Sequence, residues 1–97
     1  RIYTESELWH CGQKASRLAT RFAAKEATMK ALGTGVNGIN WKDIEVLRGR
    51  DTPPGITLHG NASKRARHLG IQGISVSLAH TKEYAVASVV AYSSTEK

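Results

Sequence analysis

Cysteine, proline, aromatic side chains and long apolar runs are all scarce in this sequence. Its 97 residues include one cysteine, two prolines, two tryptophans, three tyrosines and one phenylalanine. A lone Cys11 excludes an internal disulfide framework and suits a reducing compartment, so we expect a cytoplasmic protein. No apolar run approaches the roughly 18 residues that a membrane-spanning helix needs. These absences favour one small domain spanning residues 1–97.

Familiar catalytic and nucleic-acid-binding motifs are absent as well. The sequence contains no G-x-S-x-G, no H-E-x-x-H, no G-x-x-x-x-G-K-[ST] and no G-x-G-x-x-G. RNP1 and paired C-x-x-C motifs are missing, and the few aromatic residues do not form a stacking platform, which disfavours nucleic acid as a partner. What remains is a net charge of +6 and a pI near 9.8. That charge predicts a polyanionic partner such as a phosphate-rich cofactor or an acidic protein.

The longest predicted helix runs from about Lys14 to Leu32 and ends at Gly33. Strong helix formers fill it, and a glycine is typical of the left-handed residue after a helix. Phe22, Glu26 and Lys30 are spaced four residues apart, so they share one face. A carboxylate and an ammonium there could bind a metal–phosphate ligand. They could equally be an ordinary surface pair worth a few tenths of a kcal/mol.

Two further features of this helix suit an anion. Arg17, Arg21 and Lys25 recur every fourth residue and predict a basic stripe, either a solvated face or a clamp for phosphates. In the glycine-rich turn at residues 33–38, Gly33 and Thr34 offer backbone amides that could approach a phosphate closely. Most loops of this composition are simply turns, so the turn alone leaves both interpretations open.

The other predicted elements make an α+β domain with one small, mostly antiparallel sheet and helices covering it. A capping box at residues 4–7 begins a short helix that contains Trp9, which we expect to be a packing residue rather than a platform for a ligand. Strands are expected at residues 41–47 and 56–59, followed by a helix with Asn61 as N-cap that stops at Gly70. Strands at residues 74–79 and 84–91 form a hairpin, with His80 at its tip.

Together these segments resemble the holo-acyl-carrier-protein synthases, small 4′-phosphopantetheinyl transferases of the bacterial type. The resemblance rests on RFAAKEA at residues 21–27, KALGTG at residues 30–35, and ISVSLAHTKEYA at residues 74–85. The segments at residues 41–46 and 54–62 match the family in the expected order. This family transfers the phosphopantetheine arm of coenzyme A to a serine of an acyl carrier protein and releases 3′,5′-ADP. Fatty acid biosynthesis is the usual setting of that reaction.

The resemblance also implies roles for particular residues. Glu26 would bind Mg²⁺ and is the candidate base for the attacking serine, while Lys30 would neutralise charge on the pyrophosphate. The nucleotide would lie near Gly33 and His80. The cofactor-binding set implied in this way is Lys25, Lys30, Gly33, Thr34, His80 and Thr81. The family further implies an acidic carrier protein as partner and a trimer with sites between subunits.

One part of the family pattern is not found. Family members begin with a strand carrying Gly-x-Asp, whose aspartate is a second magnesium ligand, and a basic helix follows. This sequence opens at Arg1-Ile2-Tyr3-Thr4, which resembles the segment after both, and its first aspartate is Asp43. The alternative interpretation is therefore a non-catalytic basic module that binds coenzyme A, nucleic acid or an acidic protein.

Overall fold

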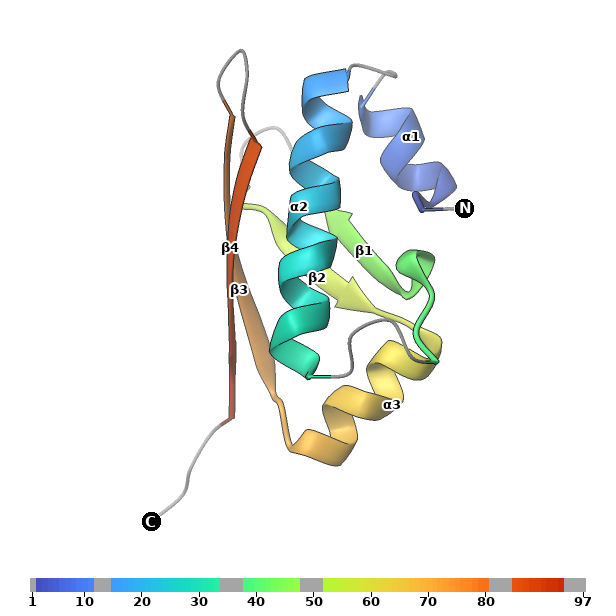
Figure 1. Cartoon of the computed structure of the whole chain (residues 1–97), viewed down its shortest axis with the longest axis vertical. Helices are drawn as coiled ribbons and strands as arrows, with labels where there is room; N and C mark the ends of the chain where they lie inside the picture. The colour runs from blue at the N-terminus through green and yellow to red at the C-terminus, as the bar shows by residue number, and fades with distance from the viewer. Residues whose placement is uncertain (1, 12–14, 34–37, 48–51, 81–84, 94–97) are drawn as a thin grey trace.

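The computed structural model describes residues 2–11, 15–33, 38–47, 52–80 and 85–93 (Figure 1). In these ranges the chain forms two α-helices, a 3₁₀ turn and a strand pair, then a third helix and a second strand pair. In chain order they are α1 (Glu5–Cys11), α2 (Ala15–Leu32), η1 (Trp41–Asp43), β1 (Ile44–Leu47), β2 (Gly55–Leu58), α3 (Gly60–Leu69), β3 (Gly73–His80) and β4 (Ala85–Tyr92).

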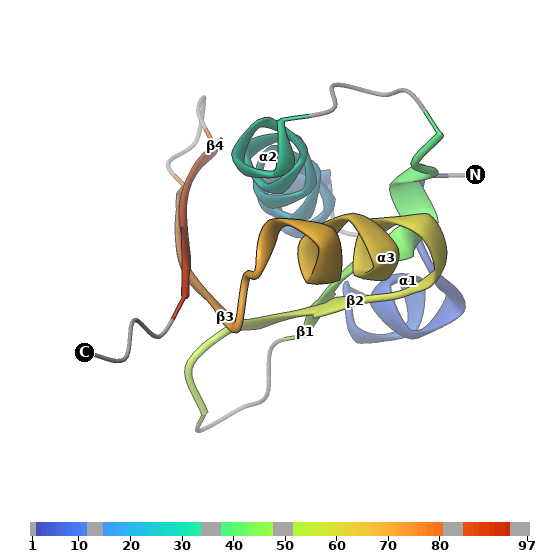
Figure 2. The same cartoon turned by 90° about the horizontal axis from the view of Figure 1, so that it is seen from below.

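The long helix α2 runs through the middle of the molecule. The β3–β4 hairpin lies along one side of it, and β1, β2 and α3 lie on the other (Figure 2). Both strand pairs are antiparallel, with Val46 opposite Ile56 in one and Val76 opposite Val89 in the other. The predicted α+β class with antiparallel pairing is confirmed. The four strands form two separate two-stranded sheets, however; β2 contacts β3, and α2 packs against both strand pairs.

The core forms where α2 meets β1 and α3. Its buried members are Met29, Leu32, Ile39, Ile44, Ala62 and Ala66, with Trp41, Ile56, Leu58 and Ile71 packed against them. Along β3 and β4 the exposure alternates, so one face of that hairpin packs on α2 while the other is exposed. The predicted inward positions Ile74, Val76 and Leu78 are all half-buried, as the two-residue period of a strand requires.

The ends of the helices agree in part with the predicted capping residues. The capping box is present: Thr4 Oγ1 accepts a bond from the Glu7 N–H at 3.1 Å, and Glu7 Oε1 accepts one from the Thr4 N–H at 2.8 Å. The third helix begins earlier than predicted, because His59 is its N-cap. Asn61 lies inside the helix instead, where its side-chain amide donates to the Gly38 carbonyl at 2.6 Å.

Two aromatic predictions need correction. Trp9 is predicted to be a packing residue, but its side chain is 84% exposed on α1. Trp41 was expected to start a strand, but it begins the 3₁₀ turn, and β1 starts three residues later at Ile44. Among the described residues, no helix has both the length and the apolar composition that crossing a membrane requires.

Candidate functional site

The predicted site residues Glu26 and Lys30 lie on the exposed face of α2. Both side chains are exposed, one helical turn apart. Phe22, one turn earlier, is half-buried and packs its ring against Trp41, with the centroids 5.1 Å apart and the ring planes inclined by 37°. An apolar contact therefore borders the charged pair on its N-terminal side.

Within the described ranges, Glu26 and Lys30 make no ion pair or side-chain hydrogen bond, with each other or with another residue. The carboxylate oxygens and the ammonium are therefore open to a ligand. One acidic and one basic group side by side suit a ligand that carries a metal cation and phosphate oxygens together. The geometry agrees with the predicted placement of this pair on one helix face.

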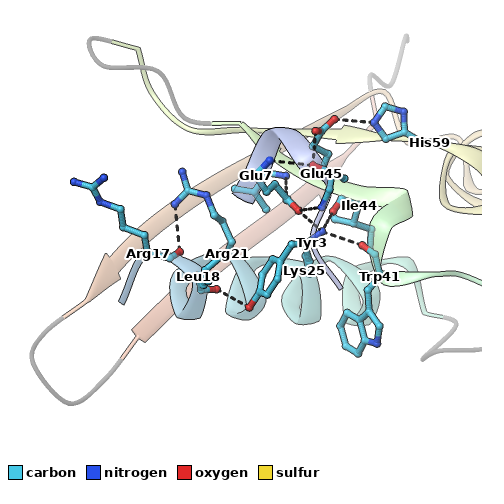
Figure 3. A network of polar contacts seen from close by, with 12 residues as sticks. Tyr3, Glu7, Arg17, Leu18, Arg21, Lys25, Trp41, Ile44, Glu45 and His59 are labelled. Atoms are coloured by element: carbon cyan, nitrogen blue, oxygen red, sulfur yellow. Dashed lines mark hydrogen bonds and ion pairs between the residues drawn. The ribbon is translucent and has the colours of Figure 1, made fainter. Parts of the chain in front are cut away.

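Lys25, which precedes Glu26, points the other way, into the interior (Figure 3). Its ammonium forms an ion pair with Glu7 Oε1 at 2.8 Å and donates to the carbonyls of Trp41 at 3.0 Å and Ile44 at 2.5 Å. The side chains of both Lys25 and Glu7 are fully buried. Burial lowers the pKa of Lys25, and the Glu7 carboxylate opposes that shift. This position does not fit the predicted contact between Lys25 and a cofactor.

The predicted basic stripe does not form a continuous exposed surface. Arg17 is exposed, but Arg21 is only 4% exposed and Lys25 is fully buried. Arg21 Nη1 donates to the Arg17 carbonyl at 3.3 Å, while its Nε has no partner among the described residues. The helix packs against the β3–β4 hairpin and against β1 and α3, and of these three residues Arg17 alone is exposed to solvent.

A further cation, Arg65, lies at the C-terminal end of α2, a placement that the sequence did not indicate. Gly33 has the left-handed conformation, with φ of 74°, and its N–H donates to the Met29 carbonyl at 3.1 Å, as predicted for a glycine after a helix. Arg65 of α3 donates through Nε to the Leu32 carbonyl at 3.0 Å. No sequence signal links Arg65 to this helix end, because the contact spans 33 residues.

The remaining predicted site residues fall at or beyond the edges of the described ranges. His80 is the last residue of β3 and pairs with Ala85, but its side chain is outside the described part of the structure. Thr34 and Thr81 are also outside the described residues. Their predicted contacts with a nucleotide therefore stay predictions.

A second polar cluster connects α1, β1 and the start of α3. Glu45 accepts a bond from the Thr4 hydroxyl at 2.7 Å and lies 3.0 Å from His59 Nε2. The Thr4 hydrogen bond, together with a smaller contribution from His59, lowers the pKa of Glu45. Glu45 is a strand residue mostly shielded from solvent, and its bond with Thr4 connects β1 to the residue that precedes α1.

The described residues contain no group of three or more His, Cys, Asp or Glu side chains that could by itself hold a metal ion. A single exposed carboxylate at Glu26 is what this face of α2 offers. That donor set still fits magnesium bound together with a substrate, because Mg²⁺ is usually held by one or two carboxylates plus phosphate oxygens.

The fold and the site together define a class of protein: a small α+β domain that presents a carboxylate and an ammonium, one turn apart, on its central helix. The family model of the 4′-phosphopantetheinyl transferase superfamily matches residues 1–89. The chain belongs to this superfamily.

Its similar relatives place it more narrowly. It is 48% identical over 94 residues to the holo-[acyl-carrier-protein] synthase of Koribacter versatilis, an alignment that covers 93% of this chain and 75% of the relative. It is 43% identical over 97 residues to the synthase of Moorella thermoacetica, covering 97% of this chain and 76% of the relative.

Solved structures agree with this assignment. The holo-[acyl-carrier-protein] synthase of Helicobacter pylori, solved in complex with coenzyme A, superposes with a TM-score of 0.83 at 33% identity. That comparison covers 95% of this chain and 78% of the other. The Neisseria meningitidis synthase gives a TM-score of 0.80 at 36% identity and covers 95% and 77% of the two chains. The family expected from the helix and hairpin motifs is thereby confirmed.

Proposed function

We propose that this protein transfers the 4′-phosphopantetheine group of coenzyme A to a serine of an apo acyl carrier protein and releases 3′,5′-ADP. Membership of the holo-[acyl-carrier-protein] synthases, with coenzyme A bound in the Helicobacter pylori relative, supports this activity. We assign the activity to Glu26 and Lys30 because this pair on α2 is exposed and has no other partner within the described residues.

The chemistry assigned to these residues is a phosphoryl transfer. The serine oxygen of the carrier protein forms a bond to the phosphorus next to the pantetheine arm. The bond from that phosphorus to the bridging oxygen breaks, and the bridging oxygen leaves with 3′,5′-ADP. The Lys30 ammonium neutralises the negative charge that develops on the leaving phosphate. Glu26 is our candidate to accept the serine proton, directly or through a water molecule.

Magnesium is the cofactor that this proposal requires, and Glu26 is the described residue that would hold it, together with phosphate oxygens of coenzyme A. When bound, the ion supplies Lewis-acid polarisation of a phosphoryl oxygen. The end of α2 suits the phosphates of the same ligand, since Gly33 carries no side chain and Arg65 lies beside it: a Cβ at Gly33 would lie 3.7 Å from Arg65 Nη2. His80, Thr34 and Thr81 complete the proposed nucleotide contacts.

The experiment that tests the activity is incubation of the protein with coenzyme A, Mg²⁺ and an apo acyl carrier protein, followed by mass spectrometry of the carrier. We expect the mass of one phosphopantetheine group to be added, and none to be added when EDTA replaces Mg²⁺. Absence of any gain with several carrier proteins would refute the proposed function. In that case, binding of coenzyme A without transfer would favour the basic-module alternative.

The proposal extends to assembly as a homotrimer in the cytoplasm. Its support is the outer face of the β3–β4 hairpin, where Val86, Val90 and Tyr92 are each more than half exposed. Apolar side chains grouped on one sheet face are typical of a surface that another subunit covers. Sedimentation velocity should give a trimer for the parent protein and a smaller species for Val90→Lys. A parent protein that sediments as a monomer contradicts this assembly.

A further inference from the structure

The buried ion pair between Glu7 and Lys25 satisfies every polar atom at its centre. An ammonium has three protons, and Lys25 has three acceptors: Glu7, the Trp41 carbonyl and the Ile44 carbonyl. The carboxylate of Glu7 also accepts the N–H of Val46 at 2.6 Å and the N–H of Thr4 at 2.8 Å. The pair thus joins α2 to α1, η1 and β1 (Figure 3).

Stability alone gives a poor reason for this arrangement. Removing two charges from water costs several kcal/mol for each ion, and replacing a buried pair with apolar side chains of similar volume is often neutral or stabilising. Met29 and Leu32, on the same side of α2, are already packed in an apolar core. An apolar pair at positions 7 and 25 would extend that core. What the ion pair adds is direction, because hydrogen bonds fix angles as well as distances.

Direction matters on this helix because its apolar contacts are weakly directional, and the bonds from Tyr3 to the Leu18 carbonyl and from Arg65 to the Leu32 carbonyl each join it to another element at a single point. The side chains of Ala24, Met29 and Leu32 are apolar, and apolar burial depends on area rather than on angle. The acceptors of Lys25, in contrast, come from three separate elements. A rotation or a slide of α2 would break several of these bonds at once. Rotation of a helix also carries every side chain with it, including the exposed Glu26, which follows Lys25 directly.

We propose that the Glu7–Lys25 pair is a positioning device that fixes the rotation of α2 and thereby sets where Glu26 and Lys30 point. The inference rests on the proposed function for the identity of the positioned groups. It assigns Glu7 and Lys25 no contact with coenzyme A or with the carrier protein. They act through the helix.

The test is the double variant Glu7→Leu/Lys25→Met of the full-length protein, compared with the parent. We expect the thermal midpoint to stay close to the parent value, because two apolar side chains of similar volume replace a buried ion pair. We expect kcat to fall about 10-fold or more and the KM for the carrier protein to change little, the scale on which supporting residues around a metal act. A second measurement does not depend on turnover. Mn²⁺ replaces Mg²⁺, and its binding in the presence of coenzyme A is monitored by electron paramagnetic resonance. The Kd for Mn²⁺ should rise about 10-fold.

The matched control is Glu5→Leu/Lys64→Met, which makes the same two side-chain changes at exposed positions on α1 and α3. It should leave kcat and the Kd for Mn²⁺ at parent values. A folded Glu7→Leu/Lys25→Met protein with parental kcat and parental Mn²⁺ affinity overturns the inference. Failure of the parent itself to transfer phosphopantetheine is a different result and counts against the proposed function.

If the double variant does not fold, Glu7→Asp provides the same test. It keeps the charge but withdraws the carboxylate by one methylene, so the pair can re-form only if α1 and α2 shift. A loss of Mn²⁺ affinity and kcat with a retained folded state supports positioning. Parental values for both quantities overturn it.

Discussion

Two neighbouring residues of α2, Lys25 and Glu26, have opposite environments. The Lys25 side chain is fully buried, with a carboxylate and two carbonyls as partners, while Glu26 is exposed and has no partner among the described residues. Successive helical residues are about 100° apart, so one motif can serve the interior and the surface at once. The charge of a residue in a family motif therefore does not determine whether its side chain lies in the interior or on the surface.

The largest expected effect is a loss of stability when one member of the buried Glu7–Lys25 pair is removed. Lys25→Met leaves the Glu7 carboxylate buried without its counter-charge, which should lower the free energy of unfolding by about 3–5 kcal/mol. Urea unfolding followed by circular dichroism measures this difference. Adding Glu7→Leu should recover most of the loss, because no unpaired charge then remains. A single variant within about 1 kcal/mol of the parent would mean that the pair is not buried in solution.

Substitution of an exposed residue of α2 should lower the activity and leave the stability almost unchanged. Lys30→Gln removes the ammonium that we assign to the leaving phosphate, so kcat should fall on the order of 100-fold. The free energy of unfolding should change by about 0.5 kcal/mol or less, because Lys30 is exposed and unpaired among the described residues. Steady-state rates and urea unfolding of the same preparation check both expectations. A kcat near the parent value would exclude Lys30 from the chemistry.

The smallest expected effect is on the pH dependence of stability. It concerns the Glu45 cluster, which lies on the same side of the fold as Lys25. The pKa of Glu45 lies below its ordinary value of 4.5, so its hydrogen bonds stabilise the folded state above that pH. This contribution is lost as the pH falls through the lower, folded-state pKa. We expect at most about 1 kcal/mol, because His59 is half exposed.

The difference in unfolding free energy between the parent and Glu45→Gln isolates this contribution, since other carboxylates titrate in both proteins. The difference should shrink as the pH is lowered from 6 towards 3. A difference that stays constant across that range would show that the Glu45 carboxylate is not preferentially stabilised in the folded state.

Much of the fold follows from local signals in the sequence. The capping box at Thr4 and Glu7, the end of α2 at Gly33 and the alternation of β3 depend on neighbours within a few residues, and all three are correct. The existence of two sheets could not be predicted in this way, because it depends on how the two strand pairs meet far apart in the sequence.

Which residues of α2 are buried and which are exposed could be predicted only in part from the sequence. Lys25 is spaced seven residues from both Leu18 and Leu32 and four from Met29, so helical geometry places it on the apolar arc. Lysine is a residue type of the surface, but here its spacing is the better guide to its position. Its partner Glu7 lies 18 residues away on another helix, and no pattern of spacing predicts such a contact. Arg65 was missed for the same reason.

The most direct test of the account is Glu26→Gln, measured for thermal unfolding and for phosphopantetheine transfer in one preparation. The substitution keeps the size of the side chain and removes only its charge. We expect an unchanged thermal midpoint and a transfer rate lower by roughly 100-fold, since the proposed metal ligand and proton acceptor is lost. A transfer rate equal to that of the parent, or a rate loss that merely follows a lower thermal midpoint, would contradict the assignment of chemistry to the exposed side of α2.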